Sequence, residues 1–326
     1  MLTLERVWKS YKVGTFGGRE LVAVRDVSFS VGPGEVVSLI GESGSGKSTI
    51  GRMVLRLNSI SRGAINFQGR DVSRLRGNAL REYYRQVQGV FQDPFSSYNP
   101  IFKADRVLAM VRDQFFPEVK PATWWERVDS TLASVRLDPA QVRNKYPHQL
   151  SGGQLQRMLI ARALLLDIDL LVADEVISML DASTRIDVLN LLADLKARGL
   201  GVLFVTHDLA LGNYISTKTV ILRKGVAVEM GDTGKVFANP QHPYSRILLG
   251  SVPQLHKKWS EVAAELELDN REVIERCLYH EQYPGECGQP PADPQQPVLA
   301  TVESDHFVAC AQEGNVQAGA LAASIP

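Results

Sequence analysis

A glycine-rich loop near the N-terminus restricts the fold more than any other feature of this 326-residue sequence. The loop runs from Gly41 to Ser48, reads GESGSGKS, and follows the apolar run Val36–Ile40. That run predicts a buried parallel strand, and the residues from about Lys47 to Leu57 predict a helix. A strand, a glycine-rich loop and a helix in this order are typical of phosphate binding. The glycines turn backbone N–H groups inward, and the helix N-terminus adds a positive dipole.

The loop matches the Walker A pattern, which indicates a nucleoside triphosphate and nothing narrower. The Lys47 ammonium is expected to reach the β- and γ-phosphates, and the Ser48 hydroxyl is expected to ligate Mg²⁺. An ordinary Gly/Ser-rich turn is the alternative, but the Lys-Ser pair in a strand–helix setting counts against it. The predicted nucleotide contacts of the loop are Gly41, Ser43, Gly44, Ser45, Gly46, Lys47, Ser48 and Thr49.

Composition narrows the class of protein. Apolar residues make up 44% and charged residues 22% of the chain, which is ordinary for a globular protein. Lys+Arg and Asp+Glu balance at 36 each, which argues against a nucleic-acid-binding protein. No apolar run approaches the ~20 residues that span a bilayer, and the N-terminal residues lack the apolar core of a secretion signal. Three cysteines beyond residue 270 make no disulfide framework, so we expect a soluble intracellular chain.

Hydrophobic patterning predicts a mainly parallel sheet covered by helices, with a helical insertion. From about residue 238 the sequence becomes rich in Pro, Glu, Gln and Cys, and after 311 it is Ala/Gly-rich and expected to fray. The predicted elements are a hairpin of residues 1–11 and 20–31, a mostly helical stretch from about 95 to 165, a strand at Leu170–Ala173, a helix after Asp181 that ends near Gly199, and a strand at Val202–Thr206.

A second segment, Leu150 to Gln156, reads LSGGQLQ and resembles the signature sequence of the ABC ATPase superfamily. Ser151 can cap the helix that follows, and small residues after it let the backbone approach a phosphate closely. An ordinary Ser/Gly helix N-terminus explains SGG alone but not the neighbouring motifs. The nucleotide contacts that the resemblance implies here are Ser151, Gly152, Gly153 and Gln154.

Four further segments resemble motifs of the same family. In LLVADE, which is similar to a Walker B strand, Asp174 is implied to join the Mg²⁺ shell and Glu175 to polarise the attacking water. Gln92, in VFQDP, matches the glutamine that contacts the metal and senses the γ-phosphate. His207, in VTHD, matches the switch histidine, although a lone histidine after a strand is usually structural. Tyr11 fits the aromatic residue that stacks on adenine, with simple packing as the alternative.

These motifs, in this order, identify residues 2–250 as similar to the ABC family. The resemblance implies an α/β P-loop NTPase with a RecA-like core, an antiparallel β-subdomain and a helical subdomain at about 95–165. It implies a nucleotide-binding domain over 1–238 and a C-terminal extension over 239–326. In the family, two subunits sandwich two ATP molecules, and each ATP is held by Walker A of one subunit and the signature of the other. Glu175 would act as base or polariser, and Asp181 would touch the partner subunit.

The segment QHPYSR at residues 241–246 resembles a hallmark of the oligopeptide/dipeptide importer ATPases, as does Tyr146-Pro-His. The resemblance implies two transmembrane permeases, a second, paralogous ATPase and an extracytoplasmic solute-binding protein as partners, and no nucleic acid. It implies peripheral attachment to the cytoplasmic face of the inner membrane, where dimer closure drives alternating access. The SMLD form ending at Asp181 is similar to members that import oligosaccharides, so the solute stays open between these classes.

Two departures from the family pattern stand out. Some relatives hold an iron–sulfur cluster with four tail cysteines, whereas here Tyr283 replaces one and leaves Cys277, Cys287 and Cys310. Because clusters prefer four thiolates, we expect these cysteines to pack or to await a substitute ligand. Val176 and Ile177 replace the usual Pro-Thr after Glu175, which is expected to loosen the turn that aims this carboxylate.

The family also implies a groove that receives a short permease helix. Here that involves Phe95 to Ile101 and the aromatic pair Phe115 and Phe116, with subdomain core as the alternative for the pair. A soluble ABC ATPase acting on ribosomes or DNA is the rival function, but such proteins carry two fused cassettes or long coiled-coil arms. A regulatory protein with an inactive cassette is a third possibility, which the intact motif residues count against.

Overall fold

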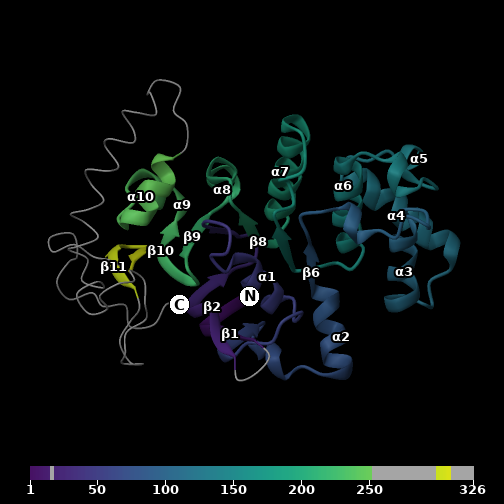
Figure 1. The fold of residues 1–326 in the computed structure, drawn as a ribbon. Coiled ribbons are helices and arrows are strands. Elements are labelled where there is room, and N and C mark those ends of the chain that lie inside the picture. Colours follow the sequence, from purple (N-terminus) through teal and green to yellow (C-terminus); the bar gives the residue numbers. More distant parts are fainter. Residues whose placement is uncertain (15–17, 252–298, 310–326) are drawn as a thin grey trace. The chain divides into compact units, whose positions relative to one another are not determined.

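The computed structural model describes residues 1–14, 18–251 and 299–309. The chain divides into two compact units, with residues 1–74 and 204–326 in unit 1 and residues 75–203 in unit 2. The division falls inside strand β8 (Gly201–Thr206). The colours of Figure 1 follow the sequence, from purple at the N-terminus to yellow near the C-terminus. Within the described ranges, no helix combines the length and apolarity needed to cross a membrane.

Unit 1 contains strands of two sheets. In the four-stranded sheet, of order β2-β1-β4-β5, strand β1 pairs antiparallel with both β2 and β4. The strands that unit 1 contributes to the second sheet follow the order β11-β12-β10-β9-β3, and β3 and β9 are parallel. The strands are β1 (Leu2–Val13), β2 (Arg19–Val31), β3 (Val36–Ile40), β4 (Arg62–Phe67), β5 (Arg70–Asp71), β9 (Lys218–Arg223), β10 (Val226–Asp232), β11 (Ala300–Glu303) and β12 (His306–Val308).

Burial follows the sequence pattern from which the strands were predicted. Every residue of β3 is buried, as in a parallel strand covered on both faces. Buried residues of β1 alternate largely with half-buried or exposed ones, as in a strand with one face on a core. The predicted N-terminal hairpin and the predicted strand before the glycine-rich loop are thus confirmed.

Some helices of unit 1 begin at side-chain caps. Asp208, Asp232 and His242 each accept a backbone N–H from the first turn of the helix that follows, which satisfies a donor that has no partner within the helix. The helices are α1 (Lys47–Val54), the 3₁₀ turn η1 (Val72–Arg74), α8 (Leu209–Ile215), α9 (Thr233–Ala238) and α10 (Pro243–Gly250).

Unit 2 combines a parallel strand pair with helices. Strands β6 and β7 are parallel, and the predicted strand at Leu170–Ala173 and the predicted helix after Asp181 are confirmed as β7 and α7. The predicted helical stretch contains α3 to α6. The elements are α2 (Gly77–Gln86), β6 (Val87–Val90), η2 (Phe95–Ser97), α3 (Arg106–Phe115), α4 (Pro121–Ser134), α5 (Pro139–Val142), η3 (Pro147–Gln149), α6 (Gly152–Leu164), β7 (Leu170–Asp174) and α7 (Ala182–Ala197).

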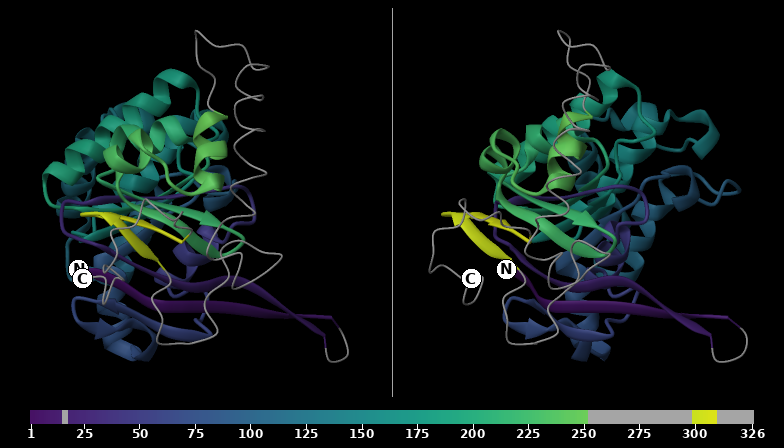
Figure 2. Two further views of the ribbon diagram at one scale, coloured as in Figure 1. Left: turned by 90° about the vertical axis from the view of Figure 1, so that its left-hand side faces the viewer. Right: turned by 60° about the vertical axis from the view of Figure 1, so that its left-hand side comes forward.

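Part of the tail is more regular than its composition suggests. Strands β11 and β12 form an antiparallel hairpin, and β12 pairs with β10. Figure 2 shows this hairpin in yellow beside the green strands of the same sheet. Residues 299–309 of the extension, which was expected to be partly irregular, therefore belong to the folded part of unit 1.

Candidate active site

The phosphate loop needs glycine at defined positions. Gly41, Gly44 and Gly46 have φ angles of +152°, +81° and +102°, a region that favours glycine. A Cβ atom on Gly41 would lie 2.1 Å from the Leu222 carbonyl oxygen, and one on Gly46 would lie 2.7 Å from that of Ala23. The loop therefore lies so close to neighbouring backbone that side chains at Gly41 and Gly46 do not fit, whereas Gly44 is favoured by its φ angle alone.

The Lys47 ammonium lies inside the loop and binds its backbone. Its Nζ donates to the Gly41 carbonyl oxygen at 2.7 Å and to that of Glu42 at 2.8 Å, and the side chain is buried. The Ser45 N–H also donates to the Glu42 carbonyl oxygen, while the Ser45 carbonyl oxygen accepts from Gly225 between β9 and β10. The loop is suited to bind a triphosphate, because the Lys47 ammonium supplies positive charge and the backbone supplies N–H donors.

Ser48 and Thr49 lie in the first turn of α1, which begins directly after the loop at Lys47. Both residues are half-buried. The first N–H groups of a helix lack intrahelical acceptors and carry the positive end of its dipole, so an anion is stabilised there. The donor set and the position of the Ser48 hydroxyl thus fit Mg²⁺ and phosphate chemistry.

Tyr11 and His207, the other site residues predicted in unit 1, lie on β1 and directly after β8. The Tyr11 hydroxyl accepts a hydrogen bond from Asn58 Nδ2 at 3.0 Å, and Lys9 Nζ lies 4.9 Å from the ring centroid. These contacts hold the half-buried ring in one orientation. His207 is exposed and precedes Asp208, the cap of α8.

The predicted Mg²⁺ ligand Asp174 is the last residue of strand β7, and the predicted catalytic residue Glu175 follows it directly. Asp174 is buried, and the half-buried Glu175 has a φ angle of +51°, an unusual value for a residue other than glycine. Such backbone strain is often found at functional sites, where the surrounding structure imposes it.

Hydrogen bonds stabilise the turn after Glu175. The Ser178 hydroxyl donates to the Glu175 carbonyl oxygen at 2.8 Å, and the Arg185 guanidinium donates to the carbonyl oxygens of Ser178 and Leu180. Val176 and Ile177 are each 2% exposed. The sequence led us to expect a loosened turn here, whereas these hydrogen bonds close the turn without a proline.

Asp181 has a local role that the sequence analysis missed, because it caps α7. Its carboxylate accepts from the Ser183 hydroxyl and from the Thr184 backbone and hydroxyl. These hydrogen bonds hold the pKa of Asp181 well below its ordinary value. The group therefore stays charged at one end of α7.

The signature segment forms the start of α6 through a capping box. Ser151 Oγ accepts from the Gln154 N–H at 3.2 Å, and Gln154 Oε1 accepts from the Ser151 N–H at 2.9 Å. The predicted cap is confirmed. A Cβ atom on Gly153 would lie 2.3 Å from Thr184 Cγ2, so this glycine allows a close approach to α7.

Within unit 2, hydrogen bonds connect the signature helix to the segment around the exposed Gln92. Gln156 Nε2 donates to the Phe91 carbonyl oxygen at 3.3 Å, and the Tyr98 hydroxyl donates to that of Leu155 at 3.0 Å. Burial raises the pKa of the Tyr98 hydroxyl, which keeps it a donor. The sequence analysis missed these contacts, although a buried glutamine on an otherwise apolar helix face is a signal for them.

The structure thus describes each predicted motif within its own unit. The glycine-rich loop, Tyr11 and His207 belong to unit 1, and the motifs around Gln92, Ser151, Asp174 and Asp181 belong to unit 2. The predicted cluster ligands Cys277, Cys287 and Cys310 lie outside the described residues.

Two family models match the chain. One, described as ABC transporter, matches residues 24–178, and the other, described as oligopeptide/dipeptide transporter, C-terminal region, matches residues 228–284. The oligopeptide transport ATP-binding protein AppF of Bacillus subtilis is 37% identical over 301 residues, which cover 89% of each chain. A putative peptide import ATP-binding protein of Brucella ovis is 45% identical over 229 residues, covering 70% of this chain and 72% of its own.

Solved structures agree with this likeness. A dimeric ATP-binding cassette in a post-hydrolysis state, bound to ADP and Pi, matches with a TM-score of 0.64 and 28% identity, covering 72% of this chain and 99% of its own. The cbiO1 protein of Clostridium perfringens, at 24% identity and a TM-score of 0.63, supports the fold, over 73% of this chain and 90% of its own. The chain therefore belongs to the family of ABC transporter ATP-binding proteins, in the branch with the oligopeptide/dipeptide transporter C-terminal region.

Proposed function

We propose that this chain is the ATPase subunit that powers an importer for oligopeptides or a related solute. The phosphate loop closed by Lys47 carries the ATPase part of this proposal, since charge and N–H donors meet there around a glycine backbone. The relatives named for peptide import support oligopeptides as the solute class. Oligosaccharides are the alternative, which rests only on the SMLD sequence at residues 178–181.

The residues of the loop and of the first turn of α1 bind the triphosphate in this proposal. Lys47 turns its ammonium from loop carbonyl oxygens to the β- and γ-phosphates, and the ring of Tyr11 stacks on adenine. Ser48, Asp174 and Gln92 would hold Mg²⁺, which supplies charge neutralisation at the phosphates when bound.

Hydrolysis is assigned to a water molecule that the Glu175 carboxylate polarises. The strained backbone at this residue supports the assignment, because it fixes the direction in which the side chain leaves β7. His207 and Gln92 respond to the γ-phosphate, so their roles are positioning and charge stabilisation, as in other phosphoryl transfers. Ser151 and its glycines contact the ATP held by the other ATPase subunit.

The permease contact is proposed for an exposed apolar surface of unit 2. Phe95 and Ile101 are 49% and 76% exposed, and Phe102 and Met110 are also exposed. Phe116 does not belong to this surface, because it is buried with its ring centroid 5.5 Å from that of Trp124. Through this contact the chain would attach peripherally to the cytoplasmic side of the membrane.

Reconstitution tests the proposal. The chain should copurify with two permease subunits and should hydrolyse ATP faster when a peptide-loaded solute-binding protein is added to the vesicles. Lys47→Ala should abolish both nucleotide binding and peptide uptake, because it removes the charge that faces the phosphates. ATP-driven uptake of an oligosaccharide and not of a peptide would favour the alternative solute. Hydrolysis that never responds to permeases would contradict transport coupling.

A further inference from the structure

The QHPY segment is buried beside the phosphate loop, where none of the proposed nucleotide roles uses it. Tyr244, in the first turn of α10, is 5% exposed. Its ring packs in a cluster with Ile221, Val228 and Val236, and its hydroxyl accepts the backbone N–H of Glu42 at 3.1 Å. Glu42 is the second residue of the phosphate loop, so a residue 202 positions along the chain contacts the loop directly.

This hydrogen bond fixes one peptide group of the loop. The peptide between Gly41 and Glu42 donates its N–H to Tyr244, while its carbonyl oxygen accepts from Lys47 Nζ at 2.7 Å. Held at both ends, the peptide plane cannot rotate without breaking one of the two contacts. The same Lys47 is proposed to bind the phosphates. The orientation of this peptide therefore also determines the position of the Lys47 ammonium before the nucleotide binds.

Tyr244 is itself held by His242. The Tyr244 N–H donates to His242 Nδ1 at 3.0 Å. Burial, with added repulsion from Arg223 and Arg246, lowers the pKa of His242 to about 3, so the ring is neutral and Nδ1 stays an acceptor at neutral pH.

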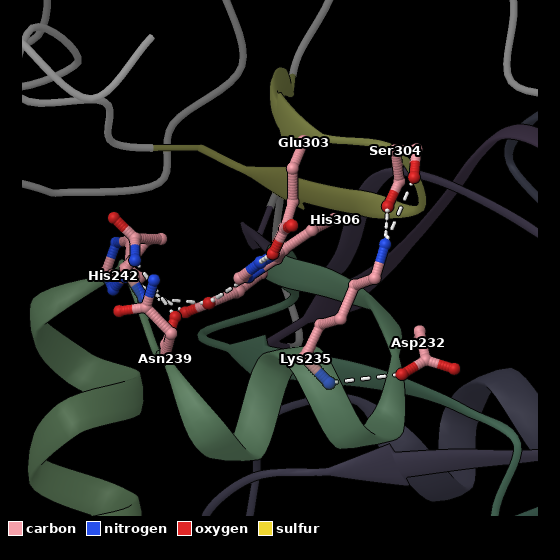
Figure 3. A network of polar contacts seen from close by, with 9 residues as sticks. Asp232, Lys235, Asn239, His242, Glu303, Ser304 and His306 are labelled. Atoms are coloured by element: carbon pink, nitrogen blue, oxygen red, sulfur yellow. Dashed lines mark hydrogen bonds and ion pairs between the residues drawn. The ribbon is translucent and has the colours of Figure 1, made fainter.

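The Glu229 carboxylate joins this turn to the C-terminal hairpin. It accepts the backbone N–H groups of Gln241 at 2.8 Å and His242 at 2.9 Å, and it contacts His306 Nε2 of β12 at 2.7 Å. Figure 3 shows this network of polar contacts, with His242, Glu303 and His306 labelled among its members. Lys235 also binds the hairpin, because its Nζ donates to the carbonyl and hydroxyl oxygens of Ser304 in the hairpin turn.

We propose that Tyr244 is a positioning residue of the phosphate loop and that the hairpin β11–β12 supports it through Glu229. The segment after the nucleotide-binding domain then helps to set the affinity for ATP. The inference rests on the proposed function, in which the loop binds the triphosphate. A continuous series of hydrogen bonds carries it, from His306 through Glu229, His242 and Tyr244 to Glu42.

The first test removes only the hydroxyl. In the full-length chain, Tyr244→Phe keeps the packed ring and leaves the Glu42 N–H without this acceptor. We expect the Kd for a fluorescent ATP analogue to rise about fivefold, the factor that one ordinary hydrogen bond represents. In the assembled transporter, KM should rise while kcat at saturating ATP stays within about twofold. Tyr83→Phe, at another buried tyrosine, is the matched control and should leave the Kd unchanged.

The second test asks whether the hairpin acts through Tyr244. His306→Ala should raise the Kd for the same analogue, and His306→Gln, which keeps a donor toward Glu229, should restore much of the affinity. In the double variant His306→Ala/Tyr244→Phe, the two losses should combine to less than their product. Fully multiplicative losses would overturn the role of the hairpin.

The controls separate this inference from the proposed function. If Lys47→Ala abolishes binding but Tyr244→Phe leaves the Kd within twofold, the positioning role of Tyr244 is wrong and the ATP-binding loop stands. If Lys47→Ala binds the analogue as the wild type does, the assignment of the loop itself is wrong. Equal thermal midpoints for the wild type and Tyr244→Phe would show that the changed Kd does not come from general unfolding.

Discussion

At the scale of single residues, the substitution Glu175→Gln should separate ATP hydrolysis from ATP binding. Glu175→Gln keeps the size of the side chain and one acceptor oxygen but replaces the other oxygen with an NH₂ donor and removes the charge, so ATP binding should stay within about twofold. Hydrolysis should fall by about 100-fold or more, as when a general base is lost, and a closed dimer should accumulate. Phosphate release and size-exclusion chromatography measure the two effects.

Glu126→Gln, at an exposed acidic residue of α4, is the control for Glu175→Gln. It should hydrolyse ATP like the wild type. Near wild-type hydrolysis by Glu175→Gln itself would refute the assigned role.

A second residue-scale test concerns the close approach of α6 to α7. Gly153→Ala places a methyl group against Thr184 Cγ2, so the free energy of unfolding should fall by about 1–3 kcal/mol. Thr184→Ser removes that methyl group and keeps a hydroxyl for Asp181, so Gly153→Ala/Thr184→Ser should regain most of the loss. Urea denaturation of all four proteins gives the comparison. Loss without rescue would mean that the methyl contact is not the cause.

Residues that sit inside a local motif could be predicted from the sequence, and residues that act across the fold could not. The loop from Gly41 to Ser48 carries its geometry in its own glycines, so its local conformation follows from the pattern. Tyr244 lies 202 positions from Glu42, and no local pattern indicates that pairing. Phe115 and Phe116 are adjacent in the sequence, yet only the folded structure decides that Phe116 is buried.

At the scale of elements, the docking of the hairpin β11–β12 should depend on pH. Burial by itself lowers the pKa of His306, but the hydrogen bond and charge of Glu229, followed by those of Glu303, raise it above its ordinary value. A group with a raised pKa stabilises the folded state fully below its unfolded pKa, about 6.5, and this contribution is lost as the pH rises through the folded value. His242, whose backbone N–H donates to the same carboxylate, stays neutral in this range because burial lowers its pKa to about 3.

We therefore expect the thermal midpoint of the wild type to be higher than that of His306→Asn. The difference between the two midpoints should be largest at about pH 6 and should shrink as the pH rises. Differential scanning fluorimetry of both proteins from pH 6 to 9 measures this. A difference that grows with pH would contradict the assigned direction of the pKa shift.

Elements with strong local signals were predicted, and elements defined by distant partners were not. The hairpin of β1 and β2 and strand β3 follow from alternation and from an apolar run next to the loop. Strand β12 has only three residues, and it is a strand because β10, about 75 positions earlier, offers a pairing edge. The Pro- and Gln-rich sequence before it gives no sign of this return to the sheet.

At the scale of the whole molecule, the proposed assembly pairs this chain with a second ATPase subunit. Val176 and Ile177 depart from the family pattern near Asp181, and such departures suggest a specialised partner. Because both side chains are buried within the subunit, a partner would not recognise them directly. Met179, in the same turn and 60% exposed, is the side chain that a partner can contact.

We expect the intact transporter to contain one copy of this chain and one copy of a related ATPase, since importers with the His-Pro-Tyr hallmark commonly use two. Native mass spectrometry of the purified complex counts the subunits. A photocrosslinker at Met179 should link to the second ATPase in the presence of ATP and Glu175→Gln, while the same group at Glu126 should not. If the complex holds two copies of this chain and the crosslink joins them to each other, the active assembly is a homodimer, and both ATP sites are built from this sequence alone.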